Sequence, residues 1–172
     1  NISWDKAKYS INTGLWGTSV GGAETLNSRD PLPESAYPSK VIKSESEELQ
    51  IEFKTGELFA INGKKGKPFE LIQRLQILAR DFGIGRDIHI GDTIIGIKGR
   101  VGFEAAAPII IIKAHHLLEK HTLSKWQLFQ KEQLSNFYGM QLHEGHYLDP
   151  VMRDLEAFMQ SSQEKVSGKV YL

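Results

Sequence analysis

Residues 17–22, Gly-Thr-Ser-Val-Gly-Gly, have the composition of a loop that could hold a phosphate. Glycines let backbone N–H groups approach an anion closely. No Gly-Lys-Ser or Gly-Lys-Thr follows, so the segment is not a Walker motif. It also lacks the preceding strand and the following helix of such loops. We favour a turn of small residues, with a phosphate site as the alternative.

The six histidines are candidates for a metal site. Three of them lie on one expected helix without the spacing of three or four that would put ligands on one face: His115, His116 and His121. His143 and His146 have that spacing, but Gly145 lies between them and the zinc-protease pattern His-Glu-x-x-His is absent. We therefore predict packed or solvent-facing histidines and no metal site.

Charged residues alternate near the middle of the chain. Lys98, Arg100 and Glu104 would share one face of a strand, because strand side chains alternate sides. We favour an ion-paired network there over an anion or substrate site. A neighbouring group of charges is expected to be solvated: Asp81, Arg86 and Asp87.

The elements that must position these residues follow from apolar periodicity and from Gly and Pro. The first forty residues are expected to be loop-rich. Strands are expected at 49–54 and 58–61, within 87–104 (two short strands or one bent strand, with bulges) and at 166–172. Helices are expected at 69–82, at 108–121, from a cap at Thr122 to about 138, and from Asp149-Pro150 to about 159. The fold class is α+β, with a mixed or antiparallel sheet packed by several helices, in a single domain over 1–172.

Composition restricts the partners. Lys plus Arg equal Asp plus Glu at 21 each, which argues against a basic nucleic-acid surface. No cysteine is present, so disulfides and thiolate metal sites are excluded. The apolar run Ile109–Ile112 is too short to span a bilayer and is expected to be a buried helix face. We expect a cytoplasmic protein without nucleic-acid or membrane partners. Because the chain starts Asn-Ile-Ser-Trp-Asp, we also expect it to be part of a longer one.

Three ordered blocks carry a resemblance to a known family. The segment 85–104, Gly-Arg-Asp-Ile-His-Ile-Gly-Asp-Thr-Ile-Ile-Gly-Ile-Lys-Gly-Arg-Val-Gly-Phe-Glu, resembles a stretch of argininosuccinate synthases. Four of its residues fall in register with that family: Gly96, Lys98, Arg100 and Glu104. The segments 136–139 and 163–170 look like the family's closing helix and strand, and Ser10 and Ser19 have the spacing of two serines that contact citrulline there.

The resemblance implies a ligase that joins citrulline and aspartate with ATP and Mg²⁺, releasing AMP and pyrophosphate. The family's phosphate-binding loop, Ser-Gly-Gly-x-Asp-Thr-Ser, is not found in this chain. We therefore expect ATP to be bound mainly by an amino-terminal half and this chain alone to be inactive, with no catalytic residue assigned in it. The resemblance also implies a homo-oligomer, a dimer or a tetramer, and we expect a carboxy-terminal arm to be missing here.

The citrulline site implied by the resemblance maps onto Ser10, Ser19, Gly91 and Phe103. Gly91 stands where the family has a Glu, and Phe103 where it has a Tyr. We consider two explanations: other residues meet the substrate ammonium, or the substrate is a citrulline whose α-amine is acylated. Asp92 would replace the Glu if a bulge re-aimed it. A non-catalytic oligomerisation or regulatory module of the same fold is a further alternative.

Overall fold

A computed structural model describes residues 8–172. The described residues divide into two compact units, each built from two stretches: 8–47 with 67–111, and 48–66 with 112–172. The units are described separately below. The expectation of a single domain over 1–172 stays a prediction.

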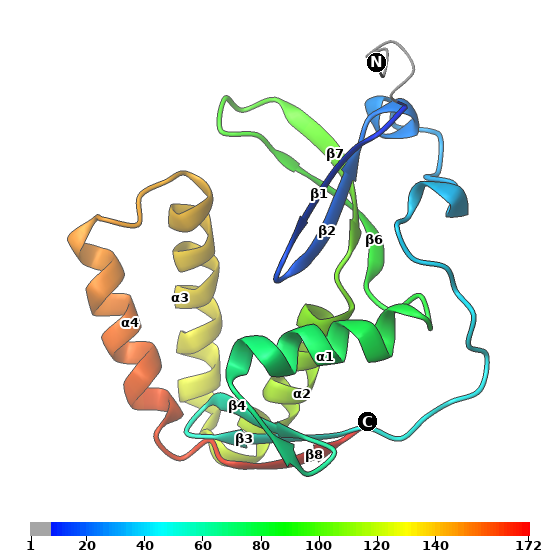
Figure 1. The fold of residues 1–172 in the computed structure, drawn as a ribbon. Coiled ribbons are helices and arrows are strands. Elements are labelled where there is room, and N and C mark those ends of the chain that lie inside the picture. The colour runs from blue at the N-terminus through cyan, green and yellow to red at the C-terminus, as the bar shows by residue number, and fades with distance from the viewer. Residues whose placement is uncertain (1–7) are drawn as a thin grey trace. The chain divides into compact units, whose positions relative to one another are not determined.

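The first unit is built around a four-stranded antiparallel sheet of order β1-β2-β7-β6. Its strands are β1 (Ser10–Gly14), β2 (Gly17–Gly21), β6 (Arg86–Asp92) and β7 (Lys98–Glu104). It also holds two short 3-10 helices, η2 (Ala23–Leu26) and η3 (Glu34–Ala36), the helix α1 (Pro68–Arg80) and the first part of α2 (Ala106–Thr122). The β6–β7 hairpin is longer than β2, so its tip extends past β1 and β2 (Figure 1).

The second unit holds a smaller antiparallel sheet of order β5-β4-β3-β8 and two helices that lie side by side (Figure 1). The strands are β3 (Gln50–Lys54), β4 (Glu57–Ile61), β5 (Lys64–Lys65) and β8 (Gly168–Tyr171), and the helices are α3 (Lys125–His143) and α4 (Pro150–Gln163). Thr55 and Gly56 join β3 to β4 with φ angles of 48° and 80°. Positive φ at both central residues is the geometry of tight hairpin turns and suits glycine.

The α+β class predicted from the sequence is confirmed, with two antiparallel sheets and four α-helices in the described residues. The loop-rich start is wrong in part, because β1 and β2 form a hairpin there. The cap of α3 is Ser124, whose side chain accepts the Gln127 N–H, whereas the Thr122 hydroxyl donates back to the Leu118 carbonyl. A β-branched residue predicted as a cap thus ends the preceding helix.

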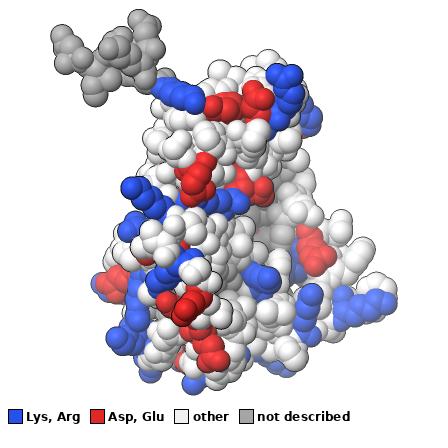
Figure 2. All heavy atoms as spheres, turned by 90° about the vertical axis from the view of Figure 1, so that its right-hand side faces the viewer, with Lys and Arg blue, Asp and Glu red and all other residues white. Residues whose placement is uncertain are grey.

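The surface in Figure 2 carries Lys and Arg interspersed with Asp and Glu, as the equal numbers of the two charges suggest. Within residues 8–172, no helix is long and apolar enough to cross a membrane. The run Ile109–Ile112 is only partly buried: Ile110 is 8% exposed, but Ile109 and Ile112 are each 51% exposed. A helix turns about 100° per residue, so four consecutive isoleucines cannot share one buried face.

Candidate functional site

The four residues predicted for the site lie on one face of the β1-β2-β7-β6 sheet. Residues directly opposite one another in an antiparallel pair point to the same side, and so do residues two apart in a strand. Ser19 is opposite Phe103 on β7, and it is opposite Asn12, which is two residues from Ser10 on β1. Phe103 is opposite Asp87, which shares its side of β6 with Gly91.

We call this surface the serine face. Its members in the described strands are Ser10, Asn12, Ser19, Gly21, Asp87, His89, Gly91, Gly99, Val101 and Phe103. Ser10 is exposed, and Ser19 and Phe103 are half-buried. Among the described residues, neither the Ser10 nor the Ser19 hydroxyl has a hydrogen-bond partner. Both hydroxyls can donate to or accept from a bound molecule.

The structure brings Ser19 and Phe103 together but keeps Gly91 farther along the hairpin. Gly91 pairs with Gly99 on β7, four residues before Phe103. At about 3.3 Å per residue, the separation along the strand is about 13 Å. The serine face is therefore long enough for an elongated amino acid to lie across it.

The opposite face of the same sheet is packed. Val20 is fully buried in a cluster with Leu32 and Ala36, against which Tyr9, Tyr37 and Ile88 pack. A Cβ on Gly102 would lie 2.5 Å from a Leu32 methyl, so only glycine lets this loop pack so closely. This packing fixes which face of the sheet stays open.

The alternating charges Lys98, Arg100 and Glu104 lie on the packed face, as their spacing predicts. Each has a structural partner: Lys98 pairs with Asp92 at 2.7 Å, and Arg100 donates to the carbonyls of Glu24 and Asp30, both at 3.2 Å. Glu104 is 3% exposed and pairs with Arg86 at 3.1 Å. The ion-paired network we favoured is confirmed only in part: among residues 8–172, Lys98 and Glu104 belong to two separate ion pairs, and Arg100 meets backbone carbonyls in place of a carboxylate.

Arg86 was predicted to be solvated, and that prediction is wrong. Its side chain is 9% exposed, pairs with Glu34 and Glu104 and lies over the Tyr37 ring. The guanidinium can satisfy two carboxylates and an aromatic ring together, which makes its burial tolerable. This burial could not be predicted from local pattern, because Glu34 is 52 residues away.

The idea that Asp92 replaces a missing Glu at position 91 is also wrong. The β6–β7 register runs without interruption from Arg86 opposite Glu104 to Asp92 opposite Lys98, so no bulge re-aims Asp92. Asp92 points to the side opposite Gly91 and is paired with Lys98.

Two polar residues of the serine face, Asp87 and His89, were missed as site residues. Both are exposed, and both precede Gly91 by an even number of residues. Period-two alternation counted back from Gly91 would have found them. The Asp87 carboxylate accepts the backbone N–H of Ile88 at 2.7 Å, and the His89 ring meets Phe103 edge-on at 6.2 Å between centroids.

The glycine-rich segment 17–22 is not a phosphate loop. Residues 17–21 form β2, which is flanked by β1 on one side and by β7 on the other. Ladder hydrogen bonds occupy the N–H groups that a phosphate would need. These residues do not fit ATP phosphates, so we derive no step through ATP from this chain.

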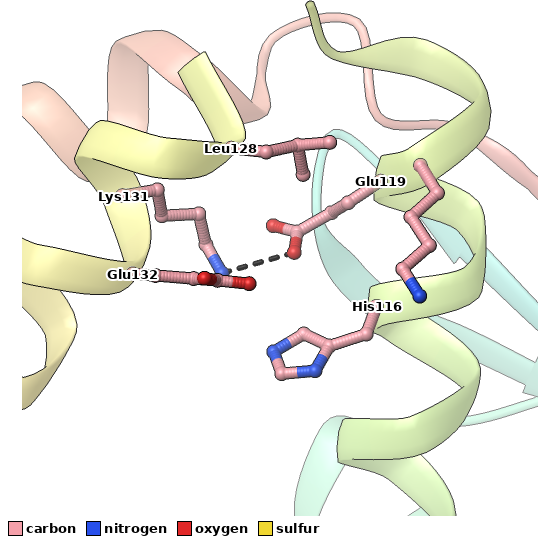
Figure 3. Close-up of a pocket in the computed structure, with 6 residues that line it drawn as sticks. His116, Glu119, Leu128, Lys131 and Glu132 are labelled. Atoms are coloured by element: carbon pink, nitrogen blue, oxygen red, sulfur yellow. Dashed lines mark hydrogen bonds and ion pairs between the residues drawn. The ribbon is translucent and has the colours of Figure 1, made fainter. Parts of the chain in front are cut away.

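The second unit holds a buried polar cluster around Glu119 of α2 (Figure 3). Glu119 is 1% exposed, accepts from Lys131 Nζ at 2.9 Å and from Gln163 Nε2 at 2.8 Å, and lies 3.4 Å from His115 Nδ1. Burial lowers the pKa of His115 below its ordinary value, although Glu119 opposes this. We call these four residues the Glu119 cluster.

A cavity of about 130 Å³ borders this cluster. Figure 3 shows its lining: His116, Glu119, Lys120, Leu128, Lys131 and Glu132. No group of three or more His, Asp or Glu residues between positions 8 and 172 is arranged to hold a metal ion. Lys131 already neutralises the buried Glu119 carboxylate. We therefore interpret the cluster as a structural contact that joins α2 to α3 and α4.

Comparison with known proteins decides the family. Residues 9–172 match the family model described as the argininosuccinate synthase C-terminal domain. The chain belongs to the argininosuccinate synthase family.

Curated relatives agree with this assignment. Argininosuccinate synthases from Methanocaldococcus jannaschii, Xanthomonas campestris and Dehalococcoides mccartyi are 38%, 35% and 37% identical to the chain over 98%, 95% and 97% of its length. The match covers 44%, 42% and 42% of those relatives. The chain thus spans about two fifths of the length of these argininosuccinate synthases.

Proposed function

We propose that the chain is the carboxy-terminal portion of an argininosuccinate synthase and that its serine face forms one wall of the site for a citrulline-type substrate. The observation that carries this proposal is the common face of Ser10, Ser19 and Phe103. These residues come from three strands and up to 93 positions of sequence, yet the antiparallel register puts them on one open surface.

The proposed reaction is a ligation of two amino acids. ATP, bound by the part of the enzyme outside this chain, would activate the ureido group and be released as AMP and pyrophosphate. The aspartate amine would form the new C–N bond at the ureido carbon and lose a proton. The serine face contributes binding and alignment, since its hydroxyls can hold the amino-acid end of the substrate while the ureido end reacts.

The remaining parts of the proposal lie outside this chain. Because residues 17–21 are a paired strand, ATP and Mg²⁺ would be bound by the part of the enzyme that corresponds to the other three fifths of the relatives. The chain by itself would then be inactive. We further propose a homo-oligomer, a dimer or a tetramer, working in the cytoplasm.

The test is pyrophosphate release by the full-length gene product with ATP, Mg²⁺, aspartate and a citrulline substrate. We expect release that requires both amino acids. A folded protein that releases no pyrophosphate with citrulline or with any Nα-acyl-citrulline would instead be a non-catalytic oligomerisation or regulatory module.

A further inference from the structure

The ring of His89 occupies the space above Gly91. A Cβ placed on Gly91 would lie 2.5 Å from His89 Nε2 and 3.3 Å from Cδ2. Real Cβ atoms do not approach other atoms as closely as 2.5 Å, so this ring position and a side chain at 91 exclude one another. Glycine leaves the volume to the imidazole.

The aromatic ring of Phe103 also contacts the His89 ring. The two rings meet edge-on, with an interplanar angle of 62° and 6.2 Å between centroids. Edge-to-face contact is a favourable arrangement for aromatic rings. The His89 ring therefore lies beside both Gly91 and Phe103 on the serine face.

The imidazole is available to a bound molecule. His89 is exposed, and its ring nitrogens make no hydrogen bond to the residues that the structure describes. An imidazole N–H donates to carbonyl or carboxylate oxygens, whereas an ammonium group has no acceptor to offer it.

The nearest carboxylates, which could bind a substrate ammonium, do not lie at Gly91. Asp92 points to the other side of the sheet and pairs with Lys98 at 2.7 Å. Asp87 is on the serine face two residues from His89 and four residues, about 13 Å along the strand, from Gly91, and its carboxylate accepts the Ile88 N–H. At Gly91 the site therefore offers a hydrogen-bond donor.

We propose that His89 is a specificity-determining residue that selects a citrulline whose α-amine carries an acyl group. His89, whose ring lies in the space that glycine leaves at position 91, donates a hydrogen bond to the acyl oxygen. This inference rests on the proposed function, since it names the substrate class of the same site.

The experiment measures kcat and KM of the full-length protein, by pyrophosphate release, with citrulline, Nα-acetylcitrulline and Nα-succinylcitrulline. The wild-type protein should have a kcat/KM at least about tenfold higher for an acylated form. His89→Ala should reduce that preference about tenfold, chiefly through KM for the acylated substrate, as expected for one hydrogen bond. His121→Ala, on exposed α2 surface, is the matched control and should leave the preference unchanged.

A second pair of variants tests the geometry directly. Gly91→Glu should impair turnover of all three substrates, because the new side chain meets the His89 ring. Gly91→Glu combined with His89→Ala should recover turnover and shift the preference toward free citrulline. Circular dichroism and thermal melts of each variant check folding. Equal losses in the single and double variants would overturn the steric argument.

The possible results separate the two proposals. A wild-type preference for free citrulline, or equal losses for all substrates in His89→Ala, would overturn the role of His89 and leave the synthase assignment standing. Absence of pyrophosphate with every citrulline form would overturn both.

Discussion

The serine face and the Glu119 cluster are both polar, but they differ in their hydrogen bonding. The charged groups of the cluster have partners within the protein, whereas the serine hydroxyls have none among the described residues. Glu119 is 1% exposed and accepts from Lys131 and Gln163 at 2.9 and 2.8 Å. Ser10 and Ser19 lie on an open face, and neither hydroxyl has a partner among residues 8–172. A charge taken out of water must be paired within the protein, whereas an exposed hydroxyl keeps its water.

This difference distinguishes polar residues that stabilise the fold from polar residues that are available to bind a ligand. A cluster whose charged groups are paired with one another has few groups free to bind a ligand. Its loss should therefore lower the stability of the fold. An open polar face adds little to folding, and its loss should lower binding. Each prediction below tests one side of this contrast, in order of decreasing expected effect.

Glu119→Ala should give the largest change, a loss of about 3–5 kcal/mol in the free energy of unfolding, because Lys131 would remain nearly buried without its partner. Urea denaturation of the purified chain measures it. Glu132→Ala, an exposed neighbour on the cavity rim, is the control and should change stability by less than about 0.5 kcal/mol. If both variants were equally stable, the Glu119 cluster would not contribute to the stability of the fold.

Ser19→Ala should lower kcat/KM for the preferred citrulline substrate about 10- to 100-fold, since one hydrogen bond to a charged group contributes about 1.5–3 kcal/mol. Its melting temperature should stay within about 1–2 °C of the wild type. Ser28→Ala, in an exposed loop, is the matched control. Normal kinetics in Ser19→Ala would remove this residue from the substrate wall.

Stability should fall as the pH drops through about 6.5, partly because of His115. Burial holds its pKa below the ordinary value, so the unfolded chain takes up a proton that the folded chain does not. The groups facing it are Glu119, Lys131 and His116, with Phe53 edge-on at 5.1 Å. His115→Gln should flatten the decline between pH 7 and about 5 in urea titrations. An unchanged pH profile would contradict this account.

Phe103→Tyr should give the smallest change, less than about tenfold in kcat/KM for any citrulline substrate. The new hydroxyl would extend the ring opposite Ser19 on the serine face and offer one further neutral hydrogen bond. Kinetics with free and acylated citrulline measure it. A gain confined to free citrulline would sharpen the role of Phe103 in choosing the substrate, and a loss of stability would instead mark a packing role.

Local patterns were sufficient for most of the elements. The β3–β4 hairpin, α1, α4 and the paired strands β6 and β7 lie close to the ranges predicted from apolar periodicity, Pro at helix starts and Gly at turns. The start was misjudged, because β1 and β2 contain many small residues, and a strand that gains its stability from pairing shows little signal of its own.

For the candidate site, too, the sequence predicted some features and only the structure revealed the others. Sequence similarity alone named Ser10, Ser19, Gly91 and Phe103, and alternation alone put Lys98, Arg100 and Glu104 on a common face. Only the tertiary structure decided that this charged face is packed, that Asp92 points away from Gly91 and that the His89 ring lies above it. The physical reason is that period-two alternation sorts residues into two faces, while packing by distant loops such as that of Leu32 decides which of them is left open.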